Sequence, residues 1–198
     1  RGSYRIAVGD EEGKRLERDY RAWKAIEALR VEWLEPDDLR KMEPGFSQDL
    51  SGGVLSKDER SLNPGRLTHA LAQRATRNGT RIQTSCPALG VRCSNGRFES
   101  VKIHGGEIAG GCLVLAAGAW TGKLGEWFET EIPIRPARGQ MVALRGYTSA
   151  PGRSIFAYTG SVLPRLDGSV FVGATTEDVG FDRRNTPEGI SRVLDMVP

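Results

Sequence analysis

The residues best suited to chemistry are small ones that end an apolar run. Ala116, Ala117 and Gly118 directly follow the apolar residues 112–115, and none of the three carries more than a methyl group. Small residues at the end of a strand let a flat or phosphorylated cofactor approach the backbone, as glycine-rich turns do in nucleotide-binding proteins. The same residues also suit a tight turn from a strand into a helix, so the pattern alone leaves both interpretations open.

Two arginines support a second hypothesis about binding. Arg135 and Arg138 bracket Pro136. A guanidinium group is a natural partner for a phosphate or a carboxylate. Arginines that are solvated, or that bridge an acidic side chain of the same protein, are the commoner alternative. Both interpretations of this pair stay open.

Several common kinds of active site lack the residues that they need. His69 and His104 are the only histidines, which leaves little material for a His-rich metal site or a Ser-His-Asp triad. None of the 25 glycines has another glycine two residues away, so the dinucleotide fingerprint G-x-G-x-x-G is absent. Cys86, Cys93 and Cys112 form no C-x-x-C pair and suit reduced thiols in a cytoplasmic protein.

Composition excludes further classes of protein. The 198 residues include 28 basic and 25 acidic ones, and this near-balance gives no reason to expect a nucleic acid or a membrane surface as partner. The longest apolar run, residues 112–120, has nine residues, whereas a membrane-spanning helix needs about 20. The chain begins with Arg1 rather than Met and carries no export signal, so we expect a cytoplasmic segment of a longer protein.

The elements that must position these residues are mostly short strands with flanking helices. Helices are expected over residues 16–30, 35–42, 64–77 and 118–127 and from Pro187 onward; strands are expected over 5–8, 53–56, 81–84, 89–93, 98–103, 112–117, 140–144, 162–165 and 170–173. The run Cys112–Ala117 is apolar without alternation, which is typical of a strand covered on both faces of a parallel sheet. Neighbouring parallel strands are not evident in this chain.

Three stretches together resemble the FAD-dependent amino-acid oxidases of the D-amino-acid oxidase superfamily, most closely the glycine oxidases of thiamine biosynthesis. They are LVLAAGAWTG at 113–122, IRPARGQ at 134–140 and VGATTEDVGFD at 172–182. Residues 58–67 also match the family's acidic segment followed by a helix that begins with proline. The resemblance covers nearly the whole chain but only the middle of the family's length.

The resemblance implies an α/β (α+β) fold without the family's amino-terminal Rossmann portion. We expect a mixed, largely antiparallel sheet of a substrate domain with flanking helices, and part of an FAD-binding parallel sheet. Residues 1–57 and 129–198 would belong to the substrate domain. Residues 58–128 would belong to the FAD domain.

The resemblance also implies roles for individual residues. The backbone of Ala88 would contact the adenine of FAD, and Ala116, Ala117 and Gly118 would lie beside the cofactor. In the hairpin formed by residues 156–173 the family often has an aromatic hydroxyl over the substrate, but this chain has Ser161 at that place. The candidate substrate contacts are therefore Ser161, Tyr158 three residues earlier, and Arg165.

The implied reaction oxidises the C–N bond of glycine or a similar small amino acid to an imine, with hydride transfer to FAD and reoxidation by O2 to give H2O2. The family's phosphate-binding loop and carboxylate-binding arginine lie outside these 198 residues, so we expect the chain alone to lack FAD and activity. A sarcosine oxidase, an amine dehydrogenase and a noncatalytic binding module that uses the sheet as an interaction surface are the alternatives. No metal is expected, and a homo-oligomer is left open.

Overall fold

The computed structural model describes residues 2–196, which form two compact units. The first, here called the sheet unit, combines the amino-terminal residues through Ser61 with the residues from Arg138 onward. The second, the middle unit, is Leu62–Ala137. These boundaries fall four and nine residues after the expected ones at 57/58 and 128/129. The assignment of the units to substrate and cofactor stays a prediction.

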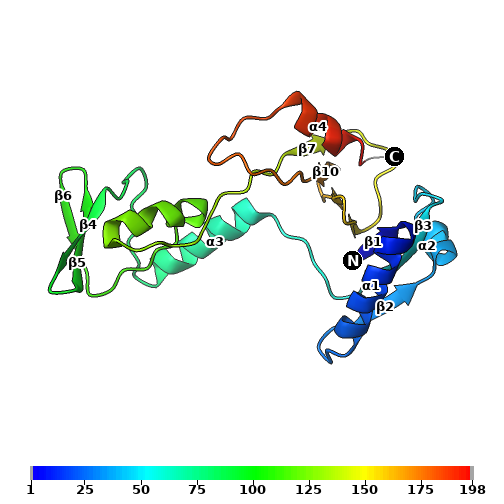
Figure 1. Ribbon diagram of the computed structural model, residues 1–198, viewed down its shortest axis with the longest axis horizontal. Helices are drawn as coiled ribbons and strands as arrows, with labels where there is room; N and C mark the ends of the chain where they lie inside the picture. The colour runs from blue at the N-terminus through cyan, green and yellow to red at the C-terminus, as the bar shows by residue number, and fades with distance from the viewer. Residues whose placement is uncertain (1, 197–198) are drawn as a thin grey trace. The chain divides into compact units, whose positions relative to one another are not determined.

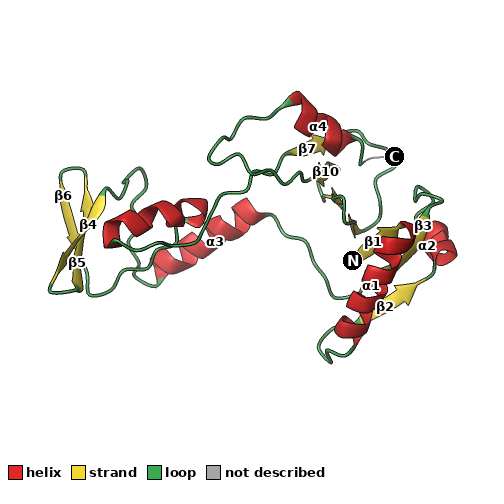
Figure 2. Ribbon diagram, in the orientation of Figure 1, coloured by secondary structure: helices red, strands yellow, loops and turns green. Residues whose placement is uncertain are grey.

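The sheet unit is built on one seven-stranded sheet (Figures 1 and 2). In spatial order its strands are β2 (Val31–Leu34), β3 (Leu50–Ser56), β1 (Ser3–Val8), β8 (Ser154–Phe156), β9 (Ser161–Pro164), β10 (Val170–Gly173) and β7 (Met141–Leu144). Every pair is antiparallel except β1 with β8, which are parallel. The expected mixed, largely antiparallel sheet is therefore confirmed.

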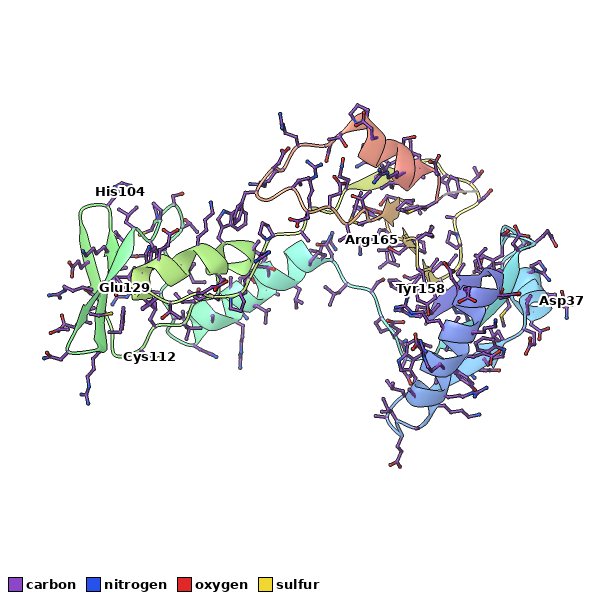
Figure 3. All side chains as sticks on the ribbon, viewed as in Figure 1. Asp37, His104, Cys112, Glu129, Tyr158 and Arg165 are labelled. Carbon is purple, nitrogen blue, oxygen red and sulfur yellow. The ribbon has the colours of Figure 1, made fainter. Side chains whose placement is uncertain are left out.

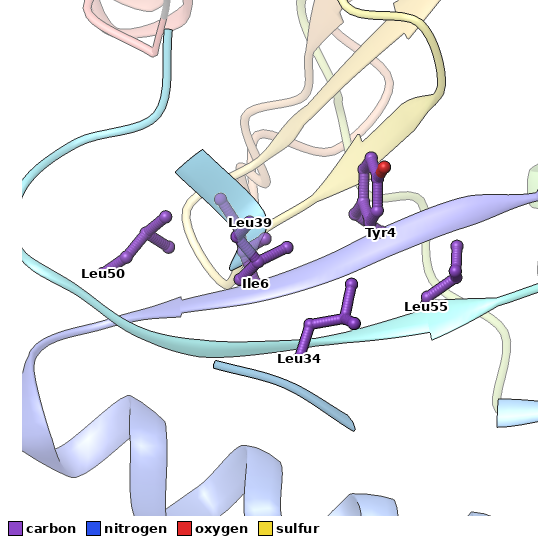
Figure 4. Packing of buried hydrophobic residues seen from close by; sticks show 6 residues of the cluster. All are labelled: Tyr4, Ile6, Leu34, Leu39, Leu50 and Leu55. Atoms are coloured by element: carbon purple, nitrogen blue, oxygen red, sulfur yellow. The ribbon is translucent and has the colours of Figure 1, made fainter. Parts of the chain in front are cut away.

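Helices cover both faces of this sheet. On one face, Leu16 of α1 (Gly9–Lys24) packs against Ala7 and Val54. On the other, Leu39 of α2 (Pro36–Met42) packs with a buried cluster that Figure 4 shows. The members of that cluster are Tyr4, Ile6, Leu34, Leu39, Leu50 and Leu55.

Strand register shows which residues share each face. Tyr4 pairs with Ile155, Ile155 with Val162, and Val162 with Val172. Since residues directly opposite one another lie on one side of a sheet, these residues all belong to the face of α2. Val172 packs against Val193 of α4 (Pro187–Leu194), so α4 lies on this face too. We call it the α2 face and the opposite side the α1 face.

The middle unit contains a helix, a small sheet and a 3-10 helix. Its elements are α3 (Pro64–Arg77), the antiparallel strands β4 (Gly90–Ser94), β5 (Arg97–Ile103) and β6 (Gly106–Ala109), and the 3-10 helix η1 (Gly118–Phe128). The side chain of Asn63 accepts a hydrogen bond from the Arg66 N–H, as expected for a helix cap. Asn95 and Gly96 both have positive φ, so the expected hairpin turn between β4 and β5 is confirmed.

Two expected strands are wrong. Residues 81–84 form no strand, and neither do Cys112–Ala117. The latter run is exposed in part, and 81% of the Val114 surface is accessible. Among residues 2–196 no strand pairs with it, and without hydrogen-bonded neighbours an apolar run has no sheet to enter. The helix expected after Gly118 is present but has 3-10 geometry.

Candidate functional site

Ser161 lies at the centre of the sheet, on strand β9. It pairs with Phe156 on one side and with Gly173 on the other, and its Oγ donates a hydrogen bond to the Gly173 carbonyl oxygen at 2.7 Å. The side chain is half-buried. Because its hydrogen is used within the sheet, the Ser161 oxygen is left to accept a hydrogen bond from a ligand.

A cavity of about 360 Å³ has Ser161 in its wall. Apolar residues of the α2 face, including Ile6, Ile155 and Val162, form much of the lining, and the carboxylates of Glu43 and Asp195 are also there. The volume lies within the range of about 300–1,000 Å³ that small-molecule sites occupy. The cavity could therefore hold a small organic molecule. Ser161 borders it, but Ser161 pairs with Phe156, which belongs to the other face, so the Ser161 side chain lies on the α1 face of the sheet.

Tyr158, labelled in Figure 3, is hydrogen-bonded to helix α1. It is not one of the residues that line this cavity. Its hydroxyl donates a hydrogen bond to Asp19 Oδ2 at 3.3 Å, and the Arg15 guanidinium lies 4.5 Å from the ring centroid. Desolvation, together with the negative charge of Asp19, raises the pKa of Tyr158 above its usual value. The phenol therefore stays protonated across the physiological range.

Arg165 follows strand β9 at the turn into β10, where Figure 3 labels it. Its guanidinium carbon lies 4.9 Å from the centroid of the Phe171 ring, a cation–π contact across the hairpin. Of the three residues expected to contact the substrate, the structure places only Ser161 in the cavity wall.

The four residues expected to contact the cofactor all lie in the middle unit. Ala88 is exposed ahead of β4, and its backbone N–H and C=O make no hydrogen bond to any described residue. Ala116 is exposed and Ala117 half-buried. Gly118 has φ +55°, and a Cβ added there would meet no atom within 4 Å. The structure therefore leaves open space beside Gly118 and the exposed Ala116.

A partly buried polar cluster missed by the sequence analysis joins the start of β7 to the segment after β10. Arg138 Nε donates to Glu177 Oε2 at 3.1 Å, so this arginine bridges an acidic side chain, one of the two interpretations left open above. Gln140, 1% exposed, donates from Nε2 to Glu177 Oε1 at 2.7 Å. Hydrogen bonds from Thr175, Arg138 and Gln140 lower the pKa of Glu177 to about 2. Arg138 and Glu177 are 39 positions apart in the sequence, and no rule of helix or strand spacing predicts a contact over that distance.

Comparison with known proteins decides the family. Residues 1–197 match the family described as FAD dependent oxidoreductase (DAO). The chain belongs to this family. FAD is the family's cofactor, so the expected cofactor is confirmed.

Curated relatives of this DAO-family chain include two kinds of protein. The bifunctional protein ThiO/ThiG of Nostoc sp. is 32% identical over 166 residues, which are 82% of this chain and 25% of the relative. The glycine oxidase of Geobacillus kaustophilus is 26% identical over 196 residues, 98% of this chain and 52% of the relative. The chain therefore spans between a quarter and about half of the length of these relatives.

Solved structures share the fold. The crystal structure of glycine oxidase from Geobacillus kaustophilus superposes with a TM-score of 0.90 at 25% identity, covering 99% of this chain and 53% of that one. An L-α-glycerophosphate oxidase of Mycoplasma pneumoniae, solved with FAD bound, has a TM-score of 0.79 at 17% identity and shows a common fold alone.

The middle unit of this DAO-family chain fits a flavin nucleotide at two places. The unpaired backbone groups of Ala88 offer one donor and one acceptor, the set that an adenine edge needs. The methyl groups and open space along Ala116–Gly118 would let a flat group lie against the backbone.

Among the described residues no cluster of His, Cys, Asp and Glu could hold a metal ion. Within residues 2–196 no helix is long and apolar enough to cross a bilayer.

Proposed function

We propose that this chain supplies the substrate-side sheet and part of the cofactor-binding half of an FAD-dependent oxidase that acts on glycine or a similar small amino acid. The observation that carries the proposal is the fold shared with glycine oxidase along 99% of the chain. The similarity to ThiO/ThiG supports it and suggests a place in thiamine biosynthesis. Because the chain spans only part of these relatives, the proposal concerns the whole protein that includes it, which we place in the cytoplasm.

The proposed reaction breaks the α C–H bond of the neutral amine. Bound FAD supplies the two-electron acceptor. The hydrogen leaves as hydride while the nitrogen lone pair forms a C=N bond, and the resulting iminium loses a proton to become the imine. Water hydrolyses the imine to a carbonyl compound and ammonia. O2 takes up the two electrons with two protons and becomes H2O2.

The residues of the sheet unit would bind and orient the amine. We propose that the Ser161 oxygen accepts a hydrogen bond from a substrate N–H, because its own hydrogen is held by the Gly173 carbonyl. A serine is also shorter than the family's aromatic residue and leaves a wider site. Tyr158 and Arg165 would shape the surroundings through their contacts with Asp19 and Phe171.

The residues of the middle unit would hold the cofactor. We propose that the backbone of Ala88 contacts the adenine and that Ala116, Ala117 and Gly118 lie along the nucleotide. Substituting Ala116→Leu places a branched side chain in the open space, so the whole protein should lose most of its FAD, measured as flavin absorbance per protein. Ala109→Leu, at another exposed alanine of the middle unit, is the matched control and should keep its FAD.

Substrate profiling tests the reaction itself. The FAD-loaded whole protein is mixed with glycine, sarcosine or D-alanine, and H2O2 formation and bleaching of the flavin without O2 are both followed. We expect bleaching and H2O2 with glycine. A preference for sarcosine indicates the related oxidase, and bleaching without H2O2 in air indicates a dehydrogenase. A flavin that none of the three amines bleaches would overturn the proposal.

A further inference from the structure

Arg5 lies on the same sheet face as Ser161, two strands away. It pairs in register with Phe156 of β8, which pairs in turn with Ser161 of β9. All three residues therefore belong to the α1 face. Two strand spacings of about 4.8 Å separate the Arg5 and Ser161 backbones by roughly 10 Å.

The guanidinium of Arg5 is held in place by two aromatic rings. Its central carbon lies 5.5 Å from the centroid of Trp23, on helix α1, and 5.6 Å from that of Phe156. Such cation–π contacts fix the position of the group but use none of its five N–H donors. Among residues 2–196 no side chain or carbonyl accepts a hydrogen bond from the Arg5 guanidinium, and the residue is exposed.

The surroundings of Arg5 carry a surplus of positive charge. Arg15 lies over the neighbouring Tyr158 ring and, within the described part of the chain, also has no ion-pair partner. The Asp19 carboxylate contacts this aromatic group through the Tyr158 hydroxyl. Other arginines of this chain do form ion pairs with acidic side chains, namely Arg21, Arg30, Arg40, Arg92, Arg138 and Arg184.

We propose that Arg5 is a specificity-determining residue that binds a second carboxylate of the substrate. The inference rests on the proposed function, because it takes Ser161 as the place of the reacting amine. A guanidinium that is oriented in advance and has free donors suits bidentate binding of a carboxylate. Phe156, between Arg5 and Ser161, offers an apolar surface to the intervening methylene groups. The substrate class therefore extends beyond glycine to small amino acids with an acidic side chain.

The test compares substrates that differ in charge but not in shape. The FAD-loaded whole protein is assayed with glutamate, glutamine and glycine, each enantiomer where one exists. Arg5→Met keeps an apolar stem between the rings and removes the donors, and should lower kcat/KM for glutamate roughly tenfold or more while leaving glutamine and glycine unchanged. Arg5→Lys should lie between. Arg18→Met, the same change at an exposed position of α1, is the control and should behave as the parent protein.

A binding measurement separates this inference from the proposed function. Glutarate has two carboxylates and no amine, so its affinity, measured by isothermal titration calorimetry, does not depend on turnover. We expect Arg5→Met to weaken glutarate binding roughly tenfold and Arg18→Met to leave it unchanged. If the protein oxidises no amine but this loss is found, the proposed function fails and the carboxylate site stands. Equal losses for glutamate and glutamine, or glutarate binding unaffected by Arg5→Met, would overturn the inference.

Discussion

Gly189, in the first turn of α4, is expected to tolerate even a single added methyl group poorly. A Cβ at this position would lie 2.0 Å from Gln140 Nε2 and 2.5 Å from its Cδ. Gln140 is 1% exposed and holds three hydrogen bonds through its amide. The amide nitrogen donates to Glu177 Oε1 and Thr186 Oγ1, and the amide oxygen accepts from the Thr186 N–H. Gly189→Ala therefore displaces a fully bonded buried side chain.

The size of the effect follows from these contacts. Losing three hydrogen bonds costs about 1 kcal/mol each. Forcing extra volume into a packed site costs about 1–3 kcal/mol more where the surroundings relax only in part. Replacing a helical glycine by alanine returns at most about 1 kcal/mol. We expect Gly189→Ala to lower the free energy of unfolding by about 3–5 kcal/mol, measured by urea unfolding followed by circular dichroism.

Two further variants test whether the collision with Gln140 causes the loss of stability. Gly65→Ala, near the start of α3, places its Cβ 3.4 Å from the nearest atom, Asn63 Oδ1, and should be neutral or slightly stabilising. Gln140→Ala removes the side chain that the new methyl group meets, so the double variant with Gly189→Ala should cost less than the sum of the two single ones. Additive costs in that cycle would refute the reasoning, because they would mean that Gln140 and residue 189 do not compete for space.

Two other predictions concern a buried leucine and a hydrogen-bonded carboxylate of the sheet unit. Leu39→Ala empties a site of 0% exposure between α2 and the sheet, and should cost about 2–5 kcal/mol of unfolding free energy in the same urea assay; a cost below 1 kcal/mol would contradict the packing shown in Figure 4. The pKa of Glu177, lowered from 4.5 to about 2, means that its ionised form stabilises the fold fully above pH 4.5. That stability should be lost as pH falls from about 4.5 to 2, and Glu177→Gln should remove this part of the pH dependence, which acid titration of unfolding would show.

Local signals in the sequence predicted local structure well. Asn63 before Pro64, Asn95 before Gly96, and Thr186 before Pro187 each mark a turn or a helix start that the structure contains. These signals work because a cap or a tight turn depends on a few neighbouring residues. The short strands β2, β6 and β8 were missed, because three or four residues show little periodicity. Strands β9 and β10 are as short, but Asp167-Gly168 marks the turn between them.

Long-range pairing could not be predicted from the same signals. In the parallel pairing of β1 with β8, Tyr4 lies beside Ile155. The ion pair between Arg138 and Glu177 connects residues that are 39 positions apart in the sequence. Neither residue type nor spacing specifies such a partner, since in the sequence any acidic residue could form the ion pair with Arg138. The candidate site depends on these pairings, and for that reason its neighbours, Arg5 and Gln140 among them, emerged only from the structure.

The error at Cys112–Ala117 has a different cause, which lies in the middle unit as a whole. Every buried hydrophobic residue among the described ones belongs to the sheet unit, and none to residues 62–137. Yet α3 carries an apolar stripe, in which Leu67 is 43% and Leu71 60% exposed, and Val114 is 81% exposed. An apolar stripe on a helix, or an unbroken apolar run in a strand, is typical of an element whose apolar side chains are buried. Residues 62–137 do not themselves bury these side chains, so an apolar run typical of a strand covered on both faces forms no strand here.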